Sequence, residues 1–240
     1  MAEIMFEKFN SVSLYISNQS VLALYASGRQ TGIMLESGAG QTNVVPIIDG
    51  IAKKDAVESN AFAGNAVTNY LRSLLSRDIC ENSVTSIKEK LCEVTLDSQK
   101  WENYADSDVA YTLPDGTEVI IGVERFKCAE AIFNPSLAGA TNTPITELFL
   151  KSISTFDEEL KSSLYKNIVV AGGNTMFPNF IERFENSLPK SKKFKVWANA
   201  ERINPTWIGG SILASMEEFN NISIKKTDYA EQGATIVKLV

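Results

Sequence analysis

The sequence contains no histidine among its 240 residues. This absence excludes Ser-His-Asp and Cys-His hydrolases, histidine-ligated metal sites and imidazole general bases within these residues. Cysteine is also scarce. Cys80, Cys92 and Cys128 are odd in number and lack C-x-x-C spacing, so the sequence indicates neither a disulfide framework nor a zinc site. We therefore expect a reducing compartment.

The sequence also has fewer basic than acidic residues and no long apolar run. The 23 Lys and Arg residues face 29 Asp and Glu residues, a formal net charge of −6, which argues against a broad nucleic-acid-binding surface. The basic run at 189–195 is short, and we interpret it as a solvated turn. No apolar stretch approaches the roughly 20 residues that a membrane-spanning helix needs. We expect neither nucleic acid nor a membrane as a partner.

The composition that remains is that of a globular chain, with 44% hydrophobic and 22% charged residues. Strand-like and helix-like segments alternate, which predicts an α/β fold with mixed sheets. The expected strands are 11–17, two arms of a hairpin over 31–50, two strands within 111–126 around a Pro-Asp-Gly turn, and 193–198. The expected helices are 18–28, with Asn18 as N-cap and Gly28 as stop, then 63–77, 83–97, two within 145–166, and 207–219. Residues 167–188 read as a buried strand, a Gly-Gly turn and a helix.

Two glycine-containing turns are the segments of the sequence that indicate ligand binding. In "ESGAGQT" (36–42), two glycines allow backbone N–H groups to form a concavity that suits a phosphate. In "VVAGGNT" (169–175), a buried strand turns on two glycines and aims free N–H groups at one point. A single Gly-Gly turn is more often a matter of tight packing. The pair together resembles the turns with which the superfamily of actin, sugar kinases and heat-shock chaperones holds ATP between two lobes.

Longer phrases narrow the resemblance to the actin and actin-related family. The phrases "IMFEKFN", "LYASGRQTGI", "SIKEKLCEV", "LPDG", "GVERFKC", "VAGGNTMFP" and "WIGGSILAS" resemble actin in actin's order, from residue 4 to residue 215, and "DYAEQGATIV" continues the similarity to 237. The resemblance implies an α/β, actin-like ATPase (ribonuclease H-like) fold with a complete large lobe and a truncated small lobe. Met1 corresponds to a point about a third of the way along actin, so we expect the first phosphate loop, its lysine and the pointed-end loop to be missing.

The resemblance also implies a division of the chain. Residues 1–26 are expected to be a remnant of the small lobe, 27–62 an inner part of the large lobe, 63–140 its outer part, 141–204 an inner part again, and 205–240 the C-terminal remnant of the small lobe.

The family's functional residues map onto individual positions. Gln19 matches the water-positioning glutamine, although without the resemblance it reads as an ordinary polar residue in a first helical turn. Glu36 and Ala39 replace aspartates, Asn43 replaces a histidine, and Ile203 replaces a lysine that closes over the base. Because Mg²⁺ is held largely through water on carboxylates, the loop fits phosphate better than metal, and only Glu36 remains as a possible ligand. The implied nucleotide-binding residues are Ser37, Gly38, Gly40, Thr42, Gly64, Lys88, Glu89, Gly172, Gly173, Asn174, Met176 and Phe177.

Two of these assignments compete with simpler interpretations. Without the family, Lys88 and Glu89 read as solvated surface on a helix. The groove that binds actin's barbed-end partners is equally well read as ordinary helix packing; its implied residues are Tyr25, Ala26, Gly28, Ile212, Leu213 and Met216.

Four hypotheses remain for function. The favoured one is a truncated actin-like cytoskeletal protein, cytoplasmic, with a partial ATP-binding cleft that binds ATP or ADP with Mg²⁺ weakly or not at all. It would act by contacting actin, actin-binding proteins or a second copy rather than as an efficient ATPase. The alternative is an ATP-binding, filament-forming actin whose missing third is encoded upstream or supplied by a partner. A gene fragment and a sugar kinase of the same superfamily are the other two.

Overall fold

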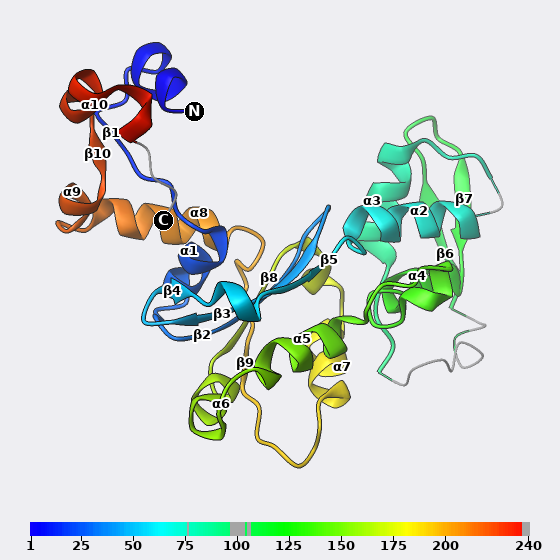
Figure 1. The fold of residues 1–240 in the computed structure, drawn as a ribbon. Helices are drawn as coiled ribbons and strands as arrows, with labels where there is room; N and C mark the ends of the chain where they lie inside the picture. Colours follow the sequence, from blue (N-terminus) through cyan, green and yellow to red (C-terminus); the bar gives the residue numbers. More distant parts are fainter. Residues whose placement is uncertain (76, 97–103, 105–106, 237–240) are drawn as a thin grey trace.

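A six-stranded sheet forms the centre of the computed structural model, which describes residues 1–75, 77–96, 104 and 107–236 (Figure 1). Its order is β4-β3-β2-β8-β9, with β5 also paired to β3. β3 is antiparallel to β2, β4 and β5, whereas β2, β8 and β9 are parallel. The bounds are β2 (Gly32–Ser37), β3 (Thr42–Ile48), β4 (Ile51–Ala52), β5 (Glu58–Asn60), β8 (Ile168–Ala171) and β9 (Val196–Trp197).

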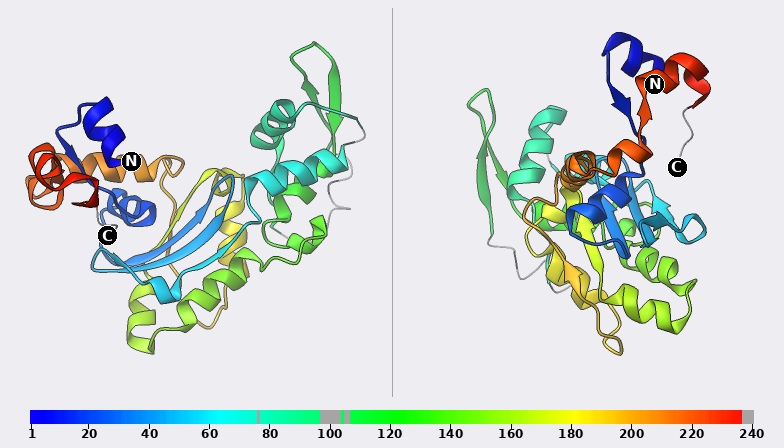
Figure 2. Two further views of the ribbon diagram at one scale, coloured as in Figure 1. Left: turned by 45° about the horizontal axis from the view of Figure 1, so that its top comes forward. Right: turned by 90° about the vertical axis from the view of Figure 1, so that its left-hand side faces the viewer.

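Helices cover both faces of this sheet because apolar side chains alternate between the faces. Ile33 and Leu35 of β2 enter the larger core cluster, while Met34 enters a second cluster on the opposite face. Figure 2 shows α1 (Gln19–Ala26) on one face, with α8 (Pro205–Ser215) packed on α1. The opposite face is covered by α5 (Ile145–Ser154), α6 (Glu158–Tyr165) and α7 (Phe180–Ser187).

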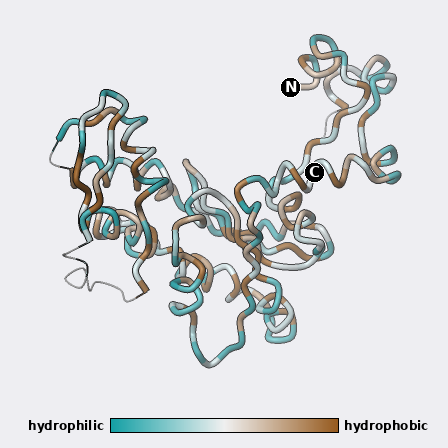
Figure 3. The backbone as a smooth tube through the Cα atoms, turned by 180° about the vertical axis from the view of Figure 1, so that it is seen from behind, coloured by the Kyte–Doolittle hydropathy of each residue, from teal (hydrophilic) through white to brown (hydrophobic). Residues whose placement is uncertain are grey.

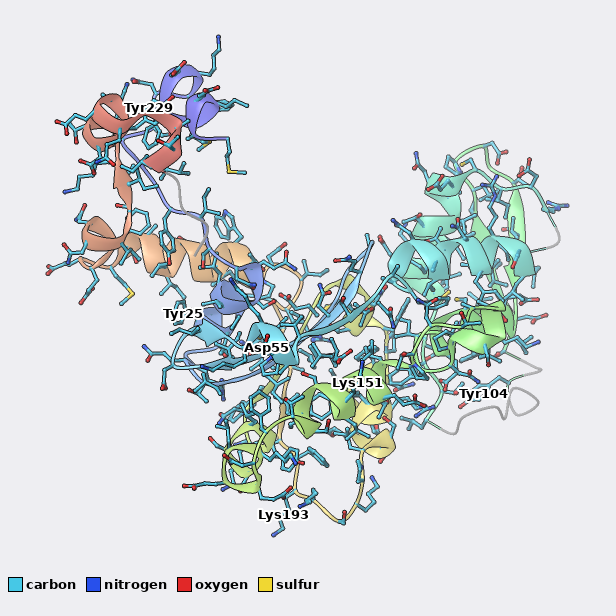
Figure 4. All side chains as sticks on the ribbon, viewed as in Figure 1. Tyr25, Asp55, Tyr104, Lys151, Lys193 and Tyr229 are labelled. Atoms are coloured by element: carbon cyan, nitrogen blue, oxygen red, sulfur yellow. The ribbon has the colours of Figure 1, made fainter. Side chains whose placement is uncertain are left out.

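Two smaller units extend from the sheet at opposite ends of the molecule (Figure 1). One consists of α2 (Gly64–Leu74), α3 (Glu81–Leu91), α4 (Glu124–Glu130) and a hairpin of β6 (Val109–Thr112) with β7 (Glu118–Ile121). The other joins the two ends of the chain: a π-helical turn (Ile4–Lys8), β1 (Ser13–Leu14), α9 (Phe219–Ile222), β10 (Ile224–Lys225) and α10 (Lys226–Gln232). β1 pairs antiparallel with β10, and the Phe6 ring stacks on that of Tyr229, labelled in Figure 4, at 4.8 Å. Short 3₁₀ turns occur at Lys54–Ala56, Pro135–Ala138, Gly173–Met176 and Gly233–Ile236.

The mixed α/β class is confirmed, and so are most elements. Asn18 caps α1 by accepting a hydrogen bond from the amide of Ser20 at 2.9 Å, and Gly28 adopts a left-handed φ of +72° just after the helix. Among the residues described, no helix has the length and apolar character to cross a membrane.

Several predicted boundaries are wrong. The strand predicted over 11–17 is only Ser13–Leu14, and the one predicted over 193–198 is only Val196–Trp197. The second strand of 111–126 ends at Ile121, because residues 124–130 form α4. Helix 207–219 begins at Pro205 and ends at Ser215, and helix 83–97 ends at Leu91, with its predicted last residue outside the described part. After the Gly-Gly turn comes a 3₁₀ turn, and α7 starts only at Phe180.

Gly209 sets how closely α8 lies on α1. A Cβ atom built on Gly209 would meet the carbonyl oxygen of Leu22 at 1.7 Å, whereas one on Gly210 would meet only the Leu22 Cδ1 atom at 3.8 Å. We expect Gly209→Ala to lower the free energy of unfolding by about 1–3 kcal/mol through overpacking. Gly210→Ala is the matched control, and should be neutral or stabilising by up to about 1 kcal/mol because alanine favours helix. Urea denaturation measures both; equal effects would contradict the close α1–α8 contact.

Candidate functional site

A cavity of about 350 Å³ lies where the two glycine turns meet. We call it the Glu36 cavity, because Glu36 is the one charged residue among those that line it. Its lining comes from β2, β3, β8, the start of α1 and the start of α8: Gln19, Glu36, Gly38, Gly40, Gln41, Asn43, Ala171, Gly172, Ile203, Pro205 and Thr206.

Parallel pairing of β2 with β8 brings the two turns together. Glu36 lies opposite Ala171 in the register, so both strands end at the same edge. Gly172 has a φ of +95°, and a Cβ built on it would meet the carbonyl oxygen of Ser37 at 2.3 Å. Its amide donates to the carbonyl of Arg202 at 2.8 Å. Glycine is required at 172 because the backbones of the two turns touch there.

A buried network of polar side chains holds the turn at 37–42 in place. The hydroxyls of Ser37 and Thr42 are 2.8 Å apart, and the amide nitrogen of Asn174 donates to the Ser37 hydroxyl and to the Gly38 carbonyl, each at 2.9 Å. The amide of Gly64 also donates to the Gly38 carbonyl, at 2.9 Å. These groups hydrogen-bond within the protein, so they shape the turn rather than face the cavity.

Three further backbone amides in the two glycine turns have no partner among the described residues, and one of them, that of Gly40, belongs to the cavity lining. Within the described part of the chain, the amides of Ala39, Gly40 and Gly173 have no protein acceptor. A Cβ at Gly40 or Gly173 would meet nothing within 4 Å, so the space beside both residues is open. Such a set of outward amides suits an anion such as a phosphate group.

Glu36 is held by the start of α1. Its Oε2 atom accepts a hydrogen bond from the Ser20 hydroxyl at 2.5 Å and a longer one from the Gln19 Nε2 atom at 3.3 Å. The side chain is only 7% exposed. Burial raises the pKa of Glu36 above the ordinary glutamate value, and the hydrogen bonds from Ser20 and Gln19 oppose that rise in part.

The cavity does not provide the usual surroundings of Mg²⁺. Octahedral magnesium is bound through one or two carboxylates, several waters and substrate phosphates. Glu36 is the sole carboxylate in the lining, and one of its oxygens is already engaged by two donors. In the residues that the structure describes, no group of three or more Cys, Asp or Glu side chains could hold a metal ion. The site therefore fits a phosphate group better than a metal–phosphate pair.

The remaining predicted nucleotide residues lie outside the cavity lining. Lys88 is buried at 8% exposure, and its Nζ atom donates to the Gly64 carbonyl at 3.2 Å and to the Thr68 hydroxyl at 2.9 Å. The surface interpretation is thus wrong for Lys88 and holds for Glu89, which is exposed. Burial lowers the pKa of Lys88 below the usual lysine value. Met176 is partly exposed, and Phe177 belongs to the larger core cluster.

A second, more apolar cavity of about 220 Å³ lies between α1 and α8, and we call it the α1–α8 groove. Its lining contains five of the six predicted groove residues together with Arg29 and Gln30; the full set is Tyr25, Gly28, Arg29, Gln30, Ile212, Leu213 and Met216. Ala26 lines a separate cavity of about 40 Å³ instead.

Sequence reasoning missed part of the Glu36 cavity. Pro205 and Thr206 reach it because α8 begins two residues earlier than predicted, and the Thr206 hydroxyl donates to the Gln19 carbonyl at 3.4 Å. Proline at a first helical position was the signal that marks this start. Gln41 and Ala171 lie within the two turn segments already identified, and the fold shows that both line the cavity.

Alanine substitutions at Gly172 and Gly173 test whether the two turns are in contact, because only the first glycine is closely packed. Gly172→Ala should lower the free energy of unfolding by about 2–4 kcal/mol, because it adds backbone strain and a clash with Ser37. Gly173→Ala should stay within about 1 kcal/mol of the parent, because no atom lies near the added methyl group. Chemical denaturation compares the two variants, and a Gly172→Ala protein as stable as Gly173→Ala would refute the contact between the turns.

Glu36 should make folding stability depend on pH. Its pKa is higher in the folded protein, so the unfolded chain releases this proton first as pH rises, and the fold loses stability through this group. In Glu36→Gln that loss is absent. The free energy of unfolding of the variant, relative to the parent, should therefore increase as pH rises above about 4, the range in which an unfolded glutamate ionises. Urea denaturation at a series of pH values tests this, and a constant or falling difference would contradict it.

The comparison with known families agrees with the fold and with the two turns. A scan against protein-family models matches the family described as Actin over residues 1–86 and 78–239. The match covers nearly the whole chain, including both glycine turns, α1 and α8. The chain belongs to the actin family.

Proposed function

We propose that this actin-family chain works in the cytoskeleton by contacting actin or actin-binding proteins, and that its nucleotide cleft is partial. Members of the family bind ATP or ADP with Mg²⁺ and are typically cytoplasmic. The single observation that carries the proposal is the uncovered apolar surface around α8. Weak nucleotide binding and poor ATPase activity follow from the Glu36 cavity.

Apolar side chains gather on the part of the molecule that the two chain ends form. Of the fourteen large apolar residues that are exposed in the described ranges, nine lie within 1–12 and 203–222. These nine are Met1, Ile4, Phe9, Val12, Ile203, Trp207, Ile212, Met216 and Ile222. In Figure 3 the strands of the central sheet and the α8 segment both contain hydrophobic stretches. The sheet is covered on both faces, whereas α8 is not.

Helix α8 makes its main contact with α1 and only a small one with α9, the helix that follows it. Gly209 is its only buried residue, and Trp207 is 76% exposed. An apolar helix that buries only a narrow stripe of its surface, and leaves its other apolar side chains exposed, is typical of an interaction surface. The α1–α8 groove continues this surface, and Tyr25 lies at its α1 side (Figure 4).

The Glu36 cavity supports the weak-binding part of the proposal. No lysine or arginine is among its lining residues, so a triphosphate would meet backbone amides and one acid. Hydrogen bonds between a cationic side chain and a phosphate are the stronger class in phosphate recognition, and this lining supplies no lysine or arginine to form them. The basic segment 189–195 does not help, because Lys193 lies on the far loop between α7 and β9 (Figure 4).

A second candidate is an ATP-binding, filament-forming actin that needs further residues, encoded upstream or supplied by a partner. The amides of Ala39, Gly40 and Gly173 favour it, since they have no protein acceptor within the described residues and are available to a phosphate group. In that case, added residues would cover α8 and bring cations to the cavity. The two candidates differ in one respect. In the first, the chain alone binds protein partners, whereas in the second it functions only after the further residues are added.

The test is association of the purified chain with itself and with monomeric actin, followed by size-exclusion chromatography with light scattering. We expect complexes with actin or self-association. Trp207→Ser should weaken them about tenfold or more, because large aromatic anchors dominate interfaces. Ile120→Ser is the matched control: Ile120 is 58% exposed but lies on β7, at the other end of the molecule (Figure 1).

Circular dichroism confirms that both variants fold. A chain that stays monomeric, binds no actin and shows no dye-detectable apolar surface would overturn the proposal. An equal loss of association in both variants would show that α8 is not the contact surface.

A further inference from the structure

Two of the three cysteines lie in contact inside the smaller unit formed by α2, α3, α4 and the β6–β7 hairpin. The Sγ atom of Cys128 donates a hydrogen bond to the Sγ atom of Cys92 over 3.2 Å. Both residues are buried in the larger core cluster, whereas Cys80 is exposed. Cys92 directly follows α3, and Cys128 lies within α4. The sequence showed only an odd number of cysteines without metal spacing, so this juxtaposition comes from the fold.

The backbones on either side of the two sulfurs are tied together. The amide of Glu93 donates to the carbonyl of Arg125 at 3.3 Å, and the side chains of the same two residues form an ion pair. Lys88, one turn before Cys92, is fixed on α2 through Gly64 and Thr68. The thiols therefore stay adjacent because their supporting segments are joined, and a disulfide would shorten the sulfur–sulfur distance from 3.2 Å to roughly 2.05 Å.

We propose that Cys92 and Cys128 are a redox modification site, which a hydroperoxide such as hydrogen peroxide converts into a reversible disulfide between α3 and α4. The inference is independent of the nucleotide cleft and of the α8 surface. Hydrogen peroxide is small enough to enter a packed core during brief openings, whereas larger disulfide reagents are excluded. A bridge formed there is protected from cellular thiols in the same way, so it persists longer than one on the surface.

The chemistry balances in two steps. In the first, one sulfur attacks a peroxide oxygen, the O–O bond breaks, and a sulfenic acid and one water are formed. In the second, the other thiol attacks the sulfenic sulfur, the S–S bond forms, the S–O bond breaks and a second water leaves. The two thiols are oxidised by two electrons in total, and the peroxide is reduced to two waters.

Either thiol can be the one that meets peroxide. Both are almost fully buried, at 2% exposure for Cys92 and 0% for Cys128, and burial raises the pKa of the Cys128 thiol well above its usual value. The two steps balance in the same way whichever sulfur is oxidised first.

The experiment exposes the folded, reduced wild-type chain to hydrogen peroxide, blocks remaining thiols in denaturant, and maps the unreduced tryptic peptides by mass spectrometry. The three cysteines fall on separate tryptic peptides: 78–88, 91–100 and 128–151. We expect a linked pair of 91–100 with 128–151, two hydrogens lighter than their sum and separated by dithiothreitol. Neither of the two buried cysteines should remain available to the blocking reagent.

The variants provide the controls. Cys92→Ser and Cys128→Ser should each abolish the linked pair, and Cys80→Ser should leave it unchanged. If a buried serine prevents folding, the wild-type map still decides. The proposal is overturned if both buried cysteines stay as thiols, if each is oxidised separately to a sulfinic or sulfonic acid, or if either links to Cys80.

Thermal unfolding provides a second measurement. A bridge that suits the native packing closes the segment 93–127 into a loop and restricts the unfolded chain, so the oxidised protein should melt at a higher temperature than the reduced one. A linked protein that melts at a lower temperature would show that the native α3–α4 contact cannot hold the bridge, and the site would be rejected.

Discussion

The parallel pairing of β2 with β8 is the constraint on which the rest of the structure depends. It ends both strands at one edge of the sheet and brings the turn at 37–42 against Gly172. Because Gly172 has no side chain, the two backbones touch, and the Asn174 amide can reach both Ser37 and Gly38. The Glu36 cavity lies beside this contact, with Glu36, Gly40 and Gly172 in its lining. The same strands carry the alternating apolar residues that define both cores.

Much of the fold could be predicted from the sequence, because periodicity and caps act locally. Asn18 and Gly28 marked α1 correctly, and both glycine turns were recognised. Tertiary packing decided the rest. Nothing local in "IKEK" distinguishes Lys88, which α2 buries, from Glu89, which stays in solvent. Likewise, Ser37 and Thr42 were predicted as nucleotide contacts, yet their hydroxyls hydrogen-bond within the protein. Which side of a loop faces a cavity depends on long-range partners, and a single sequence does not show them.

The Glu36 cavity and the apolar surface of α8 are the two candidate binding surfaces of this actin-family chain, and each is incomplete in a different way. The Glu36 cavity has the backbone geometry for a phosphate, but its lining has no cation and only one acid, which α1 already engages. The α8 surface has apolar side chains in abundance, but no second element of the described chain covers them. The two surfaces meet at the start of α8, where Pro205 and Thr206 line the cavity and Trp207 is exposed. One interacting partner at this place would act on both surfaces.

The central claim is that these residues form one side of a phosphate site without a place for the metal. Titration of the chain alone with a fluorescent ATP analogue, once with Mg²⁺ and once with a chelator, tests it most directly. The account predicts a dissociation constant of about micromolar or weaker that is the same in both conditions, because neither a cation nor a metal cluster contributes. Submicromolar binding that is lost on removal of Mg²⁺ would contradict it.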